Sequence, residues 1–222
     1  MGRVYPPHYI MIITSLAKYN PIPSAERIRT EFRLPWLELD IEVPHKEILN
    51  EYLNVESDAI LHRSDDKVLG AEHKGWRSLT IHGKDKHNTE GSDGILDWTD
   101  IADKCPKTVQ WINDNFIINS DVTGRIRFMH LDPGGYILPH HDREEKRLNE
   151  INVAIRHPEG CIFKFPERGI IPFVDGKAFM IDISNTHTVY NDSNEMRLHI
   201  ILHTEVPNNI VERSYEKSYY ST

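Results

Sequence analysis

Residues 124–142 read GRIRFMHLDPGGYILPHHD. Two runs of apolar and alternating residues flank the turn signal Pro133-Gly134-Gly135, and such runs are typical of β-strands with one buried face. The chain keeps this texture up to residue 204, with turn-forming residues such as Pro158-Glu159-Gly160 and Asp175-Gly176 between short apolar runs. Closely spaced strands of this kind predict an antiparallel barrel or a two-sheet sandwich.

The strand-rich half is expected to hold eight strands. They lie at 124–131, 136–140, 149–156, 161–165, 170–174, 177–183, 187–190 and 196–204. The first 120 residues are of mixed character. Their patterns predict strands at 9–14 and 76–81, helices at 43–53 and 108–116, and a polar loop at 83–94 that is long enough to form a lid. The predicted fold class is therefore mainly β with helices (α+β), with a jelly-roll core that carries helices from the N-terminal half.

The length fits one domain, residues 1–222. Within it we expect an N-terminal elaboration at 1–120, a metal-binding core at 121–206 and a C-terminal tail at 207–222. Composition limits the partners, because 34 acidic residues against 26 basic ones give a net charge of −8, which argues against nucleic acid. The longest apolar run, at 9–13, is too short to span a membrane and has no signal-peptide pattern, so we expect a cytoplasmic protein.

A candidate metal site ends the strand that follows the Pro-Gly-Gly turn. Residues two apart in an extended strand point to the same side, so His140 and Asp142 can converge on one point. His187 lies in a later strand-like segment. Two imidazoles and one carboxylate form the facial triad that suits Fe(II), because three coordination positions stay open for a cosubstrate and dioxygen.

Arg197 strengthens this interpretation. The turn signal at 191–194 is expected to fold its strand back beside that of His187, which would direct a guanidinium towards the same cavity. An arginine inside an apolar strand needs a buried anion, and a guanidinium is the natural bidentate partner of a carboxylate. A dicarboxylic keto acid that chelates the iron would supply that anion.

The sequence resembles the aspartyl/asparaginyl β-hydroxylase family and the related bacterial cis-proline hydroxylases. The resemblance rests on the residues above and on Pro133-Gly134, Pro139-His140, the segments at 152–155 and 176–182, and the span from His187 to Arg197. The likeness runs from about Gly124 to His203. It implies a double-stranded β-helix (jelly-roll, cupin-like) core and a dioxygenase that uses Fe(II), 2-oxoglutarate and O2. Iron would be held by His140, Asp142 and His187, and the distal carboxylate of 2-oxoglutarate by Arg197.

Three departures from the family pattern concern the contacts around this site. The animal β-hydroxylases have glycine where this chain has Asp142, so the present triad is complete, as in the cis-proline hydroxylases. The family often has a serine in place of Met129, and an arginine and a histidine in place of Glu150 and Asn152. Asn152 can still donate a hydrogen bond to a 2-oxoglutarate carboxylate. An inward Glu150 would repel that carboxylate, so we expect it to face elsewhere or to meet a cationic substrate group.

The resemblance implies hydroxylation of a free amino acid or of a peptidyl Asp, Asn or Pro residue, with release of succinate and carbon dioxide. The partner is thus a small amino acid or a short peptide segment. Trp76, Arg77 and His82 are candidate substrate contacts, because their strand ends at the possible lid. Two alternatives stay open: a cupin-type metal enzyme that does not use 2-oxoglutarate, and a non-catalytic binding module. The sequence gives no indication of the substrate's identity or of the oligomeric state.

Overall fold

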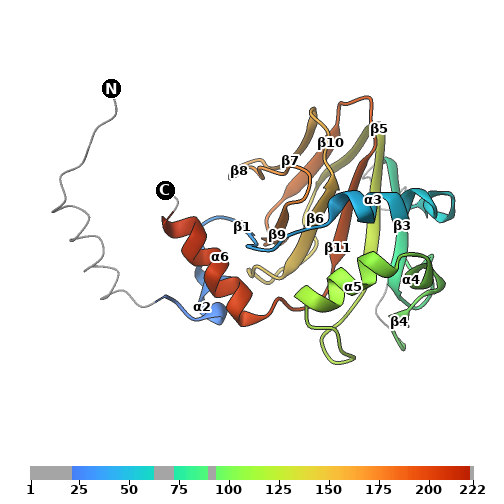
Figure 1. The fold of residues 1–222 in the computed structure, drawn as a ribbon. Helices are drawn as coiled ribbons and strands as arrows, with labels where there is room; N and C mark the ends of the chain where they lie inside the picture. The colour runs from blue at the N-terminus through green and yellow to red at the C-terminus, as the bar shows by residue number, and fades with distance from the viewer. Residues whose placement is uncertain (1–21, 63–72, 90–93, 221–222) are drawn as a thin grey trace, which may run out of the picture.

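The computed structural model describes residues 22–62, 73–89 and 94–220. The described chain forms one strongly curled antiparallel sheet with helices against its outer face and at one end (Figure 1). The strands are β1 Trp36–Glu38, β2 Ile60–Leu61, β3 Lys74–Gly83, β4 Asp97–Trp98, β5 Ile126–His140, β6 Glu150–Arg156, β7 Cys161–Phe165, β8 Gly169–Ile170, β9 Ala178–Ile181, β10 His187–Asn191 and β11 Arg197–Leu202. The helices are α2 Ala25–Glu31, α3 His45–Leu53, α4 Asp100–Lys104, α5 Pro106–Asn115 and α6 Asn208–Tyr220, with a short 3-10 turn at Glu56–Asp58.

Strand order follows β1-β9-β6-β11-β5-β10-β7-β8, and β3 also pairs with β5. This order confirms the predicted double-stranded β-helix core, in which neighbouring strands come from distant parts of the chain. The N-terminal half contributes to the same sheet, because β1 pairs with β9 and the long strand β3 pairs with the first half of β5.

Strand β5 turns the corner between the two halves of the barrel. Its residues 126–131 lie between β11 and β3, while its residues 136–140 pair with β10. The corner falls at Gly134 and Gly135. Gly134 has φ +68°, and a Cβ on Gly135 would lie 2.8 Å from the carbonyl oxygens of Asp132 and Lys74. The Pro-Gly-Gly signal thus bends one continuous strand where the sequence predicted two separate strands, because glycine lets the backbones approach closely enough to keep the pairing.

Side-chain alternation divides the sheet into two faces. On β11, Leu198, Ile200 and Leu202 belong to the core cluster that packs under the helices. A second cluster fills the barrel interior; it includes Met129, Leu131, Phe163, Phe179 and Val189. The residues that alternate with those of the first cluster along the same strands face this interior, because successive side chains of a strand point to opposite faces.

Helix ends are held by specific contacts. Ser24 caps α2, and its hydroxyl accepts from the amide of Arg27. The Glu51 carboxylate of α3 accepts from the amides of Lys107 and Thr108 at 2.7 and 2.9 Å, which satisfies two free donors at the start of α5. The Glu51 contacts hold α5 against α3, and both helices lie beside the sheet (Figure 1).

Most predicted elements lie within a few residues of the observed ones. Segment 207–222, expected as a tail, contains helix α6, whose Glu212 accepts from the amide of Ala25 at 3.2 Å. The strand predicted at 9–14 lies outside the described residues, as do residues 90–93 of the expected lid loop. No helix among the described residues has the length and apolar character needed to cross a membrane.

Candidate metal and cosubstrate site

Two histidines face each other across the pair of strands β5 and β10. The antiparallel register places His187 directly opposite His140, and directly opposed residues point to the same face of a sheet. Their ring centroids are 4.4 Å apart. Two imidazoles from distant parts of the chain therefore meet inside the barrel mouth.

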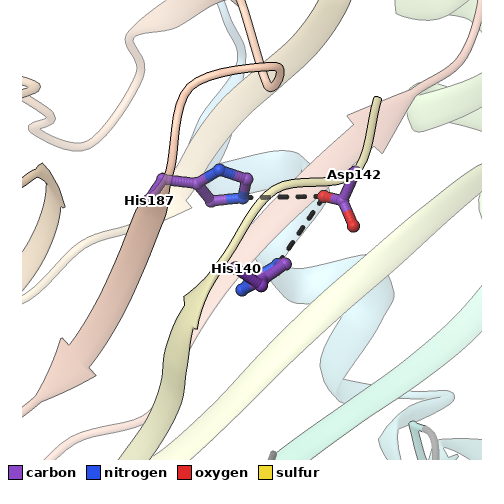
Figure 2. Close-up of side chains that lie close together, drawn as sticks. All are labelled: His140, Asp142 and His187. Atoms are coloured by element: carbon purple, nitrogen blue, oxygen red, sulfur yellow. Dashed lines mark ion pairs between the residues drawn. The ribbon is translucent and has the colours of Figure 1, made fainter. Parts of the chain in front are cut away.

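Asp142 completes the group just beyond the end of β5. Its amide donates to the carbonyl of Ile183 at 3.1 Å, which holds this segment against the end of β9. Its Oδ2 atom lies 3.6 Å from Nε2 of His140 and 3.6 Å from Nε2 of His187 (Figure 2). The three potential ligand atoms all lie within 4.8 Å of one another. The structure thus brings together the three residues that the sequence singled out.

Backbone hydrogen bonds set the orientation of both rings. Nδ1 of His140 lies 2.7 Å from the carbonyl oxygen of Leu138, and Nδ1 of His187 lies 3.0 Å from that of Asn185. Since a carbonyl oxygen only accepts, each Nδ1 carries the proton and each Nε2 presents a lone pair to the shared space. Burial is the main cause that lowers the pKa of His187 to about 4, and so keeps this ring neutral at physiological pH.

A cavity of about 930 Å³ opens over this group. Apolar side chains from four strands and the segment after β9 form part of its wall: Met129, Ile137, Phe163, Ile183, Val189 and Ile201. The Phe163 ring stacks on His187 with centroids 5.3 Å apart. Such walls exclude water from the reaction space.

Arg197 lines the same cavity and is 3% exposed. Burial lowers the pKa of its guanidinium to about 10, so the group stays charged at neutral pH. Its buried Nε has no hydrogen-bond partner among the described residues. A buried guanidinium with a free donor is a site for an anion.

A hydrogen-bonded chain supports this arginine from behind. Nη2 of Arg197 lies 2.9 Å from Nδ1 of His199, and Nε2 of His199 lies 3.0 Å from Nδ1 of His157. Nε2 of His157 reaches the Cys161 carbonyl at 3.2 Å, so it carries the proton. His199 then donates to His157 and accepts from Arg197. Oδ1 of Asn152 also lies 2.6 Å from this Nδ1. Because Nδ1 accepts from Arg197, the Asn152 amide fits here with its NH2 group turned towards Nδ1 as a donor, and this predicted cosubstrate contact lies beside Arg197.

Burial lowers the pKa of His199 far below its usual value and lowers that of His157 to about 3, with the charge of Arg197 as the second cause. Both imidazoles are therefore neutral. The two histidines therefore add no positive charge beside the guanidinium, and Nδ1 of His199 accepts a hydrogen bond from Arg197.

Of the three predicted substrate contacts, only Trp76 lines the cavity. It pairs with Leu131 and shares its face, whereas Arg77 points to the opposite face and reaches Asp132 with Nε 3.3 Å from Oδ2. His82 binds the Gly124 carbonyl at 2.8 Å, after an irregularity in the β3–β5 register. Strand alternation and this register shift explain why the structure does not bring Arg77 and His82 to the cavity.

Two further histidines that were not among the predicted site residues contribute to the surroundings of this cavity. His199 supports Arg197, and His203 lines the cavity with Glu150. The signal was present in the sequence, because both residues share the parity of Arg197 along β11.

The donor set fits iron and a keto acid. Two imidazoles whose Nδ1 atoms are held by backbone carbonyls and one carboxylate share one space, which suits a six-coordinate divalent ion with open positions. The unpartnered Nε of Arg197 fits a second, distal carboxylate. Fold and site therefore define a jelly-roll protein built to hold a divalent metal beside a buried anion subsite.

Comparison with protein-family models identifies the family. Residues 42–207 match the model described as aspartyl/asparaginyl beta-hydroxylase. Since the match covers most of the chain, the protein belongs to the aspartyl/asparaginyl β-hydroxylase family, and it is an enzyme of the 2-oxoglutarate-dependent dioxygenase class. A search of curated proteins finds no match.

Solved structures with the same fold include a prolyl hydroxylase from Trichoplax adhaerens in complex with a hypoxia-inducible-factor peptide fragment. It is 11% identical with TM-score 0.51, and the match covers 96% of this chain and 97% of that one. Another is a viral collagen prolyl hydroxylase from Paramecium bursaria Chlorella virus-1, at 15% identity and TM-score 0.43, covering 77% and 95%. The first of these likenesses concerns the fold alone.

Proposed function

We propose that this protein is an Fe(II)- and 2-oxoglutarate-dependent hydroxylase that acts on an amino acid or on a peptidyl Asp, Asn or Pro residue and releases succinate and carbon dioxide. One observation carries the proposal. Three ligand atoms within 4.8 Å of one another share a cavity with a buried arginine whose Nε has no partner among the described residues.

Each residue has a defined task in this proposal. His140 and His187 present Nε2 to the metal because their Nδ1 protons are held by backbone carbonyls, and Asp142 supplies the anionic ligand. Arg197 binds the distal carboxylate of 2-oxoglutarate, with His199 holding the other side of the guanidinium. The apolar walls keep water out.

With dioxygen as the oxidant, bound iron and 2-oxoglutarate would supply the chemistry to hydroxylate an unactivated C–H bond: one oxygen atom would enter the substrate and the other the succinate formed when the keto acid loses carbon dioxide. The protein determines which hydrogen is removed, because the cavity wall positions the substrate against the metal.

The test measures two quantities with Fe(II), ascorbate and 2-oxoglutarate. One is succinate formation. The other is the visible charge-transfer band that appears anaerobically when 2-oxoglutarate chelates Fe(II). We expect both in the wild type, loss of both in Asp142→Ala, and a weaker band that needs more 2-oxoglutarate in Arg197→Leu. His141→Ala serves as the matched control, since its ring is exposed and does not line the cavity.

A cupin-type metal protein that does not use 2-oxoglutarate would bind iron and give neither the band nor succinate. A non-catalytic module would bind neither iron nor 2-oxoglutarate. Either result would refute the proposed function.

A further inference from the structure

The cavity extends beyond the metal group and Arg197 to a charged end. Arg125, Arg127, Arg143, Glu150 and His203 line this part. A volume of about 930 Å³ lies at the upper end of the roughly 300–1,000 Å³ of small-molecule sites, which leaves room for a second small molecule beside a keto acid. The charged end is therefore placed to hold the substrate.

Glu150 is the buried acid of this end. It lies two residues before Asn152 on β6 and so faces the interior with it. The residue is 5% exposed, and its Oε2 has no hydrogen-bond partner among the described residues. Its Oε1 lies 3.2 Å from Nε2 of His203.

Among the described residues, no arginine or lysine lies within ion-pair distance of this carboxylate. Burial and the nearby arginines lower the pKa of His203 to about 3, so this contact is with a neutral ring. His203 is also the only described group within ion-pair distance of Glu150. A buried carboxylate without a cation is unfavourable, and burial raises the pKa of Glu150 to about 8. A ligand that brings a cation would relieve this cost.

Arg143 supplies the opposite charge on the same cavity. It follows Asp142 directly, its side chain is exposed, and it makes no hydrogen bond or ion pair within the described residues. Two other arginines of the cavity are engaged: Arg147 holds Glu26 through two hydrogen bonds, and Arg29 binds the Val206 carbonyl. The charge of Arg143, after that of Arg127, lowers the pKa of Glu150 against the larger effect of burial.

We propose that Glu150 is the subsite for a protonated amino group of the substrate and that Arg143 receives the carboxylate of the same molecule. The substrate class is thus a free amino acid whose amine carries a proton. A peptidyl Asp, Asn or Pro residue lacks this charge, because its nitrogen is part of an amide. The inference rests on the proposed hydroxylase function and narrows its substrate.

The experiment is calorimetric titration of the full chain with each of the protein L-amino acids and with its N-acetyl counterpart. It is run anaerobically with Fe(II) and 2-oxoglutarate, and again without either. We expect at least one free amino acid to bind, and acetylation of its amine to weaken the Kd by roughly 10- to 100-fold, as loss of a charged hydrogen bond does.

Glu150→Gln should weaken the binding of the free amino acid by a similar factor and leave that of the N-acetyl compound almost unchanged. Glu145→Gln is the matched control, because Glu145 lines the cavity but is exposed. The thermal midpoint and the 2-oxoglutarate affinity of Glu150→Gln report whether the variant is folded. An amide in place of a lone buried acid should not destabilise the fold.

Three results would overturn the inference: equal binding of free and acetylated compounds, unchanged binding in Glu150→Gln, or binding of none of the amino acids. If 2-oxoglutarate still chelates iron in those cases, the proposed function stands and only the substrate class falls. If 2-oxoglutarate does not bind at all, the proposed function falls, and the titration without iron and cosubstrate still decides on Glu150.

Discussion

Nε2 of His199 lies 3.0 Å from Nδ1 of His157, and this pair of neutral imidazoles forms a support behind the buried guanidinium of Arg197. The support leaves His199 as an acceptor, so Arg197 is held from one side while its Nε is free on the other. In the proposed function, the orientation of the cosubstrate would therefore depend on two residues that do not line the cavity.

Replacing His199 by Phe removes the acceptor and keeps an aromatic ring of similar volume. We expect the KM for 2-oxoglutarate to rise roughly tenfold or more, since a hydrogen bond to a charged group contributes about 1.5–3 kcal/mol. The kcat should change much less. Steady-state kinetics that vary 2-oxoglutarate measure both constants.

His199→Asn is the matched variant, because its amide oxygen can replace Nδ1 as acceptor. Partial recovery of the 2-oxoglutarate KM is expected. If His199→Phe and His199→Asn lower kcat equally and leave the KM for 2-oxoglutarate unchanged, the His199 side chain contributes only to packing.

Metal binding should stabilise the fold, because the ligands come from strands that meet only in the folded barrel. At a metal concentration of 100 times the Kd, the free energy of unfolding rises by about 2.7 kcal/mol. For a chain of this size that corresponds to roughly 5–10 °C in the thermal midpoint. The shift should vanish in His187→Ala and persist in His141→Ala. A midpoint that rises equally in both variants would place the metal elsewhere.

Glu150 should make the stability depend on pH. Burial and the charge of Asp142 raise its pKa from the ordinary 4.5 to about 8, against the lowering effect of Arg127 and Arg143. The folded state thus keeps a proton that the unfolded chain has lost. Stability falls as pH rises from about 4.5 to about 8, by at most about 5 kcal/mol. Urea unfolding of the wild type and Glu150→Gln at several pH values measures this loss, and parallel curves for the two proteins would contradict it.

Trp76 and Arg77 test the face assignment of β3. Trp76→Leu opens the cavity wall and should weaken substrate use while the 2-oxoglutarate affinity stays within about twofold. Arg77→Ala removes a half-exposed contact with Asp132, and such surface pairs contribute roughly 0–1 kcal/mol. Assays of succinate formation with substrate should show a defect in the first variant only. A larger defect in Arg77→Ala would mean that Arg77 contacts the substrate.

Gly135→Ala tests the corner of β5. The added Cβ would meet two carbonyl oxygens at 2.8 Å, so we expect a loss of roughly 1–3 kcal/mol in the free energy of unfolding. Gly134→Asn is the control, because its position has open space and asparagine tolerates a positive φ. Denaturant unfolding of both variants measures their free energies of unfolding. Equal values for Gly135→Ala and Gly134→Asn would show that the backbone at the corner relaxes without cost.

Local patterns were sufficient to predict much of this fold. Alternation and turn residues located the strands from 124 to 204, and the spacing of His140 and Asp142 identified the metal end, because both signals act over a few residues. The residues alone indicated a jelly-roll core, a facial triad suited to Fe(II) and a dicarboxylic keto acid, and the family resemblance specified the double-stranded β-helix and 2-oxoglutarate.

Long-range pairing set the limits of prediction. Nothing within residues 74–83 indicates that this strand lies beside β5, so Arg77 and His82 were assigned to a cavity that they do not reach. The inward direction of His203 and Glu150 follows from strand parity. Their meeting does not, because it depends on how β6, β9 and β11 align.

The corner at Gly135 also acts as a lever. Five residues of extended chain separate it from His140, which amounts to an arm of roughly 17 Å. A change of about 4° in the bend of the strand at this corner would move that imidazole by roughly 1 Å. Catalytic groups must be held within about 0.5 Å of their productive position, so this shift would be large. Arg197 pairs with β5 before the corner and would stay in place. Adjusting the small residues at 134–135 is thus a way to change the distance between metal and cosubstrate anchor without altering either one.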